Sequence, residues 1–64
     1  MKIVLNGEAR EVEATTLTEL LIEAGFSGRV ATAVNEAFVP ATLRDTQMLA
    51  DGDRVEIVAP MQGG

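Results

Sequence analysis

The segment TTLTELLIEAGF limits the possible folds of this chain more than any other part of the sequence. Thr16 followed by Glu19 forms a capping box, in which each side chain can satisfy a free backbone N–H at the start of a helix. Gly25 can adopt the left-handed conformation that ends a helix, and Phe26 can supply the apolar contact that closes such a cap. The segment therefore predicts one short helix with defined ends.

One face of this helix is apolar. Its residues recur at the i, i+3, i+4 and i+7 spacing of a buried stripe, and they are Leu17, Leu20, Leu21 and Ala24. A chain of 64 residues buries only about 60% of the surface that it exposes when unfolded, so it has room for one modest core. We expect a single domain in which this stripe covers the core.

Strand patterns lie on both sides of the helix. In KIVLNGEAREVE, the pair Asn6-Gly7 accepts the positive φ angles of a tight turn, which predicts a hairpin. Its first strand places Ile3 and Leu5 on one face, and its second strand is expected around residues 10–13.

The second half of the chain predicts further strands. RVATAVN is expected to form a strand that turns at Asn35-Glu36 into the short AFVP segment, which ends at Pro40. Residues 41–50 predict irregular structure with one helical turn, anchored by Met48 and Leu49. The last strand, RVEIVAP, alternates between two faces. Val55, Ile57 and Ala59 share one of them, and Arg54, Glu56 and Val58 share the other.

The simplest shared core for these elements is one helix lying across one sheet. We therefore predict an α+β fold with a mixed sheet of four to five strands and one main helix packed across it. If the first and last strands pair in parallel, the chain leaves the sheet from its middle. The predicted domain covers residues 1–60, and residues 61–64 are predicted to be a flexible tail.

No catalytic group is evident within this domain. The chain has no cysteine and no histidine, which removes disulfides, thiol nucleophiles, the commonest general base and the commonest metal ligands. Ser27 has no base to activate it. Asp51-Gly52-Asp53 is interpreted as a turn without a metal ion, and Glu19 and Glu23 as the solvated face of the helix.

The net charge limits the kinds of partner that this chain can bind, and the first residues limit its location. Ten acidic residues against five scattered basic ones give a net charge of −5, which disfavours nucleic acid and favours either simple solubility or steering toward a basic protein. The first apolar run is too short for a signal peptide or a membrane span. We expect a cytoplasmic protein that contacts neither membrane nor nucleic acid and is monomeric alone.

The last two residues, Gly63 and Gly64, suggest a function. Glycines without a Cβ allow a thin, extended chain to enter a partner's active site. The terminal carboxylate of Gly64 would then be the reactive group. Its attack on the α-phosphate of ATP would give an acyl-adenylate, from which a sulfur donor could displace AMP and leave a thiocarboxylate.

In the order KIVLNGE, TTLTELL, AVNEAFVP, LADGDRVEIV and GG, these motifs resemble the ThiS family of sulfur carriers in thiamine biosynthesis, over the whole chain. The resemblance implies a ubiquitin-like β-grasp fold and a carrier, not an enzyme. It implies no bound cofactor, because ATP is used by the partner. In PMQ, before the glycines, the sequence departs from the family's run of small and aliphatic residues.

The resemblance also implies the partners. An E1-like adenylyltransferase would adenylate Gly64, with Gly63 fitting its channel. The sulfur would then pass to a thiazole synthase, with a cysteine desulfurase upstream. We predict partner contacts at Met61 and Gln62 and at a patch of outward-facing valines, Val4 and Val58.

Three other functions remain open from the sequence. The small subunit of molybdopterin synthase is a β-grasp carrier with the same ending, although its relatives are usually longer. A ubiquitin-like modifier would be joined to a protein amine through Gly64. A plain interaction module would keep its function when both terminal glycines are removed.

Overall fold

A computed structural model describes residues 1–59 of the protein, and the predicted tail at 61–64 lies outside these residues. The described part contains five strands, one α-helix and one turn of 3-10 helix. In chain order these are β1 (Lys2–Leu5), β2 (Glu8–Glu11), α1 (Leu17–Glu23), β3 (Ala31–Val34), β4 (Ala37–Val39), η1 (Ala41–Leu43) and β5 (Arg54–Val58).

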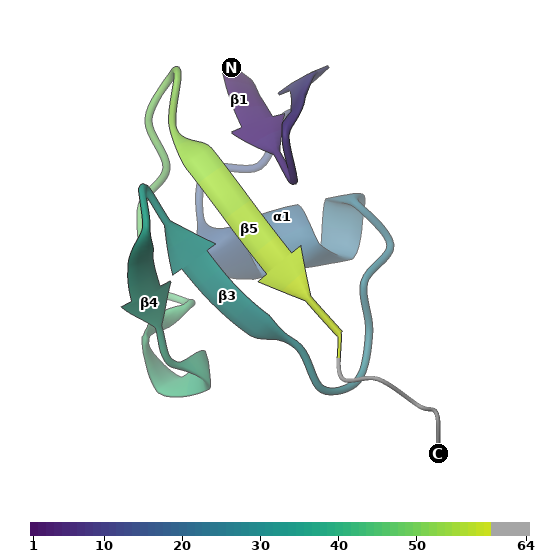
Figure 1. Ribbon diagram of the computed structural model, residues 1–64, viewed down its shortest axis with the longest axis vertical. Helices are drawn as coiled ribbons and strands as arrows, with labels where there is room; N and C mark the ends of the chain where they lie inside the picture. Colours follow the sequence, from purple (N-terminus) through teal and green to yellow (C-terminus); the bar gives the residue numbers. More distant parts are fainter. Residues whose placement is uncertain (60–64) are drawn as a thin grey trace.

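The five strands form one mixed sheet in the order β2-β1-β5-β3-β4. β1 and β5 are parallel, and the other neighbours are antiparallel. α1 packs across one face of the sheet (Figure 1). These features confirm the predicted α+β fold, and the parallel pairing of the first and last strands, which the sequence left as a condition, is present. β5 is therefore the central strand, and the described chain leaves the sheet from its middle.

Both hairpins turn through two residues with positive φ. The angles are 50° and 86° at Asn6 and Gly7, and 51° and 73° at Asn35 and Glu36. Because such a turn contains only two residues, β2 begins directly after Gly7, at Glu8. The prediction of the second strand around residues 10–13 was therefore displaced by two positions. β2 is an edge strand with four exposed residues, and the chain enters the core only at Val12.

The predicted helix caps are both present. The Thr16 hydroxyl accepts a hydrogen bond from the Glu19 N–H at 3.2 Å. At the other end Gly25 has a φ of 84°, and the Phe26 N–H donates to the Leu21 carbonyl at 2.9 Å. This is the arrangement of a Schellman cap. Each cap is formed by hydrogen bonds between residues that are close in sequence, which explains why the sequence predicts both caps correctly.

The core lies between α1 and the inner face of the sheet. It comprises Ile3, Leu5, Val12, Ala14, Leu17, Leu20, Val34, Val39, Leu49, Val55 and Ile57. Leu49 anchors the irregular segment as predicted, but the prediction for Met48 was wrong, because its side chain is 62% exposed. Consecutive extended residues point to opposite sides, so only one of the two can face the core. No helix within residues 1–59 is long and apolar enough to span a membrane.

Candidate functional site

The end of β5 is the described part of the chain closest in sequence to the predicted carrier residues. The predicted site includes Met61, Gln62, Gly63 and Gly64, which lie outside the described residues. The strand that precedes them is β5. Ile57 is buried on the inner face of β5, and Val58 points to the outer face. The candidate site therefore follows directly on the central strand of the sheet.

β1 covers only the first part of this strand. The two strands pair at Val4 with Arg54 and at Leu5 with Val55, after which the chain turns away into β2. Asn6, the first residue of that turn, continues the pairing with its side chain. Its Oδ1 accepts from the Ile57 N–H at 2.8 Å, and its Nδ2 donates to the Ile57 carbonyl at 3.1 Å. The amide of one side chain thus replaces the next residue of a strand.

The outer face of the sheet carries an apolar surface beside this end of β5. Val58 lies opposite Ala31 on β3, and Ala33 on β3 lies between Glu56 on β5 and Phe38 on β4. Val58 is 60% exposed and Phe38 is 69% exposed. We call Ala31, Ala33, Phe38 and Val58 the outer apolar surface. Exposed large side chains gathered in this way are typical of protein contact sites.

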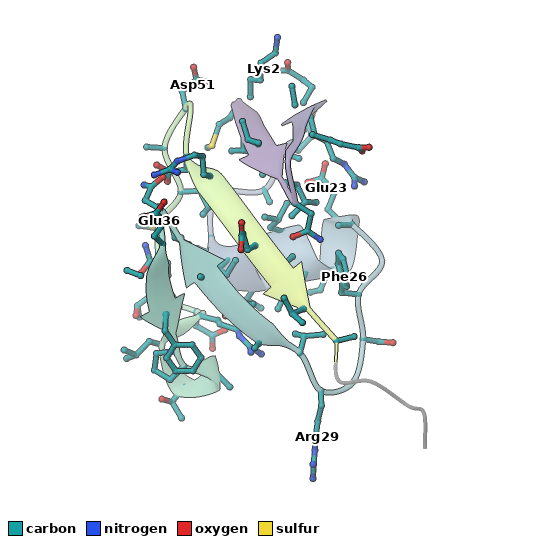
Figure 2. All side chains as sticks on the ribbon, viewed as in Figure 1. Lys2, Glu23, Phe26, Arg29, Glu36 and Asp51 are labelled. Carbon is teal, nitrogen blue, oxygen red and sulfur yellow. The ribbon has the colours of Figure 1, made fainter. Side chains whose placement is uncertain are left out.

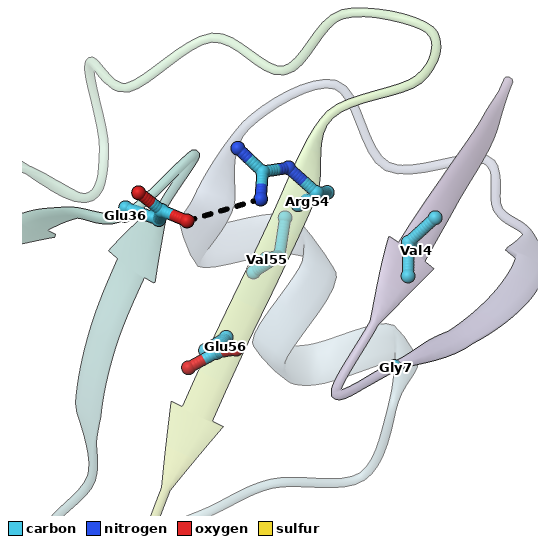
Figure 3. Close-up of a pocket in the computed structure, with 6 residues that line it drawn as sticks. All are labelled: Val4, Gly7, Glu36, Arg54, Val55 and Glu56. Carbon is cyan, nitrogen blue, oxygen red and sulfur yellow. Dashed lines mark hydrogen bonds and ion pairs between the residues drawn. The ribbon is translucent and has the colours of Figure 1, made fainter.

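Val4 does not belong to this surface, so the prediction of one patch containing Val4 and Val58 was wrong. Both residues do point outward on neighbouring strands. However, the parallel register pairs Val4 with Arg54, four residues before Val58, or about 13 Å along a strand. Val4 instead lines a shallow depression of about 110 Å³ with Gly7, Glu36, Arg54, Val55 and Glu56 (Figure 3).

That depression is a poor site for a small-molecule substrate. Its volume is below the range of about 300 to 1,000 Å³ that is usual for ligand pockets. Two of its lining residues, Arg54 and Glu36, form an ion pair of 3.2 Å, and both side chains are largely exposed. Among residues 1–59, no group of acidic side chains is arranged to hold a metal ion. Neither observation indicates a small-ligand site within residues 1–59.

Glu19 and Glu23 are exposed, as predicted, but they also have a structural role that the sequence did not reveal. The Glu23 carboxylate accepts from the backbone N–H groups of Glu13 and Ala14 at 2.9 to 3.1 Å. The Thr15 backbone N–H and hydroxyl both donate to Glu19, which lowers the pKa of that carboxyl. Together they tie the segment before the helix to α1. Figure 2 shows Glu23 at the helix end nearest the β1–β2 hairpin.

A second polar connection joins β3 to β4 and to the residue that follows η1. Thr32 is 1% exposed, and its hydroxyl donates to the Val39 carbonyl at 2.7 Å. The Arg44 guanidinium donates to the Thr32 hydroxyl and to the Val30 carbonyl. Thr32 lies directly opposite Ile57 on β5. Sequence reasoning missed Arg44, because it lies in the irregular segment that no periodic pattern covers.

Comparisons with known proteins agree with this architecture. A protein-family model described as "ThiS family" matches residues 3–64. The sulfur carrier protein ThiS of Thermus thermophilus is 50% identical over 62 residues, which cover 94% of this chain and 95% of that protein. A thiazole synthase of Paramagnetospirillum magneticum is 41% identical over 66 residues, which cover this whole chain but only 20% of that protein.

Solved structures give the same result. The crystal structure of the thiamine biosynthesis protein ThiS from Geobacter metallireducens matches with a TM-score of 0.85 and 28% identity, over the full length of both chains. An NMR structure of a thiamine biosynthesis protein from the same organism matches with a TM-score of 0.83 and 28% identity, covering 100% of this chain and 88% of that one. With the family match, the identity and the fold in agreement, this chain belongs to the ThiS family of sulfur carrier proteins.

Proposed function

We propose that Gly64 is the residue that carries sulfur and that it does so as a C-terminal thiocarboxylate. The main observation in support is that the family match extends through Gly64. In the sequence, Gly64 follows the central strand of the sheet by a few residues. Gly63 contributes a second residue without a side chain, which suits entry into a narrow channel. The chain has no cysteine or histidine that could carry or activate sulfur elsewhere.

The proposed chemistry has two steps. A carboxylate oxygen of Gly64 attacks the α-phosphorus of ATP, pyrophosphate leaves, and an acyl-adenylate forms. A sulfur nucleophile such as hydrosulfide then attacks the acyl carbon, AMP leaves as the acyl C–O bond breaks, and the thiocarboxylate remains with release of one proton. An E1-like adenylyltransferase would catalyse the first step. A cysteine desulfurase would supply the sulfur as an enzyme persulfide, from which a thiol reductant releases hydrosulfide and is itself oxidised to a disulfide.

The sulfur acceptor is a thiazole synthase in this proposal. The supporting observation is that a segment of the thiazole synthase from Paramagnetospirillum magneticum is 41% identical to this chain. A carrier sequence within a protein of that name favours the thiazole pathway over the molybdopterin pathway. We also propose that the reaction takes place in the cytoplasm, where the partner enzymes have access to ATP.

Docking of the adenylyltransferase is proposed to involve the outer apolar surface. This surface adjoins the end of β5, so a partner that covers it would also lie next to the point where residue 60 begins. Its apolar side chains are bordered by exposed Glu56, which lies opposite Ala33, and a polar residue at the edge of an apolar surface is typical of protein interfaces. Met61 and Gln62 are proposed to contact the partner's channel, between this surface and the glycines.

The experiment that tests the first step is ATP–pyrophosphate exchange catalysed by the adenylyltransferase. We expect exchange with the full chain and none with a chain lacking Gly64, although both fold. Arg10→Ala, an exposed change on edge strand β2, is the matched control and should support exchange at the wild-type rate. Equal exchange with and without Gly64 would contradict the proposal.

A further inference from the structure

The two hairpin turns hold β5 from opposite sides with the same residue type. Asn6 and Asn35 are each the first residue of a two-residue turn, with φ angles of 50° and 51°. Asn35 lies at the start of β5, where its Oδ1 accepts from the Arg54 N–H at 2.9 Å. Asn6 lies near the end of β5 and bonds both backbone groups of Ile57.

The contact made by Asn6 has no substitute in β1, because β1 has already turned away at this point. β1 contributes its last backbone bond to β5 from the Asn6 N–H to the Val55 carbonyl, at 2.9 Å. On the other side, β3 remains paired with β5 through Ala31 and Val58. The end of β5 is thus held on one side by a strand and on the other by a single amide group.

From this geometry we infer that Asn6 is a positioning residue for the carrier reaction: its amide fixes the end of β5 and so the direction in which the chain continues toward Gly64. This inference rests on the proposed function of Gly64. Ile57 precedes residue 60 by three positions, and its backbone groups are only partly exposed. Loss of the amide leaves both groups unpaired on that side, which favours fraying of the strand end.

The kinetic consequence is specific. When only a fraction of carrier molecules has the strand end in the binding-competent position, the apparent affinity for the partner falls by that fraction. Molecules that do bind have the same carboxylate and react at the same rate. A positioning role therefore raises the KM for the carrier and leaves kcat unchanged, whereas partial global unfolding lowers the amount of active carrier.

The test compares Asn6→Gly with Asn35→Gly in adenylation by the E1-like adenylyltransferase, at a temperature where both variants are folded. Glycine accepts the positive φ of both turns, so each change removes the amide and keeps the turn. We expect Asn6→Gly to raise KM about tenfold with kcat unchanged, and Asn35→Gly to change KM by less than about twofold. Amide hydrogen exchange should accelerate at Ile57 in the first variant and at Arg54 in the second.

Equal changes of KM in the two variants, or an unchanged KM for Asn6→Gly, would overturn the inference. Should Asn6→Gly fail to fold, Asn6→Asp keeps the acceptor for the Ile57 N–H and loses the donor, so we expect an intermediate KM. A wild-type KM for Asn6→Asp would then overturn the inference. Absence of adenylation with the wild-type chain would instead refute the proposed function, while hydrogen exchange at Ile57 would still report whether Asn6 holds the strand.

Discussion

The start and the end of β5 are held in the same way but differ in what surrounds them. At the start, Asn35 bonds the Arg54 N–H and the Asp53 carboxylate, in contacts that are exposed to solvent. At the end, Asn6 bonds both backbone groups of Ile57 in a partly buried position. The start adjoins a charged depression, and the end adjoins the outer apolar surface. The contacts at the start are polar and exposed, whereas the apolar surface at the end is where we propose that the partner docks.

The turns themselves differ at their second residue. Gly7 adopts its φ of 86° without steric penalty, whereas Glu36 adopts 73° with a Cβ. Glu36 has an ion pair with Arg54 that compensates in part, but an exposed pair contributes only about 0 to 1 kcal/mol. The β1–β2 hairpin is therefore the less strained of the two. In Figure 2, Glu36 lies at one end of the sheet, and Arg29, in the loop between α1 and β3, lies at the other end.

The largest effect is expected from a charge on the outer apolar surface. Val58→Asp should weaken binding to the adenylyltransferase about tenfold, because an unpaired carboxylate would be buried in the interface. The domain should remain folded, since Val58 is 60% exposed. Calorimetric titration measures the affinity, and circular dichroism measures the fold.

Ile22→Asp is the matched control for this comparison. Ile22 is 74% exposed on α1, on the other side of the sheet, so the same chemical change should leave the affinity unaltered. Unchanged binding by Val58→Asp, or equal weakening by both variants, would remove the outer apolar surface from the proposed interface.

A smaller effect is expected from exchanging the second residues of the two turns. Gly7→Glu should lower the free energy of unfolding by about 1 kcal/mol, because the new side chain must adopt a left-handed backbone. No atom lies within 4 Å of a Cβ placed at this position, so the effect is conformational and not a clash. Chemical denaturation of the variant and the wild type measures the difference.

The reverse change tests whether the ion pair matters at the start of β5. Glu36→Gly should raise the free energy of unfolding by about 0.5 kcal/mol, since relief of the left-handed backbone outweighs the exposed ion pair and the added freedom of the unfolded chain. A decrease in stability would show that the contact between Glu36 and Arg54 is stronger than its exposure suggests.

The smallest effect is expected at Glu19, which lies away from both ends of β5. Hydrogen bonds from Thr15 hold the pKa of this carboxyl below its ordinary value of 4.5. A lowered folded-state pKa stabilises the protein above the unfolded-state pKa, and this contribution is lost as the pH falls through the folded-state value. Glu19→Gln should therefore be slightly less stable than the wild type at pH 7 and equally stable in acid. A stability difference that persists in acid would contradict this assignment.

The sequence predicted most of the fold because its signals are local. The turn at Asn6, the helix cap at Thr16 and the glycine at position 25 each act on neighbours only a few residues away. The alternation in β5 also predicted correctly that Val55 and Ile57 are buried. The carrier residues were proposed from the sequence alone, and the family comparison supports the assignment of the chain to sulfur carriers.

The sequence could not predict how distant segments align. Asn6 and Ile57 are 51 positions apart, and no local pattern specifies that the amide of one meets the backbone of the other. The same limit explains the error at Val4, whose neighbour on β5 is set by the parallel register. Strand alternation gives the face of a residue, but only strand pairing gives its position along that face.

The central claim is that Gly64 carries sulfur as a thiocarboxylate. Its most direct test is the intact mass of the protein after incubation with ATP, the adenylyltransferase and a sulfur donor, beside a chain that lacks Gly64. We predict a mass gain that corresponds to one oxygen replaced by sulfur, in the full chain only. No gain, with an adenylyltransferase that is active on another carrier, or an equal gain in the chain lacking Gly64, would contradict the claim.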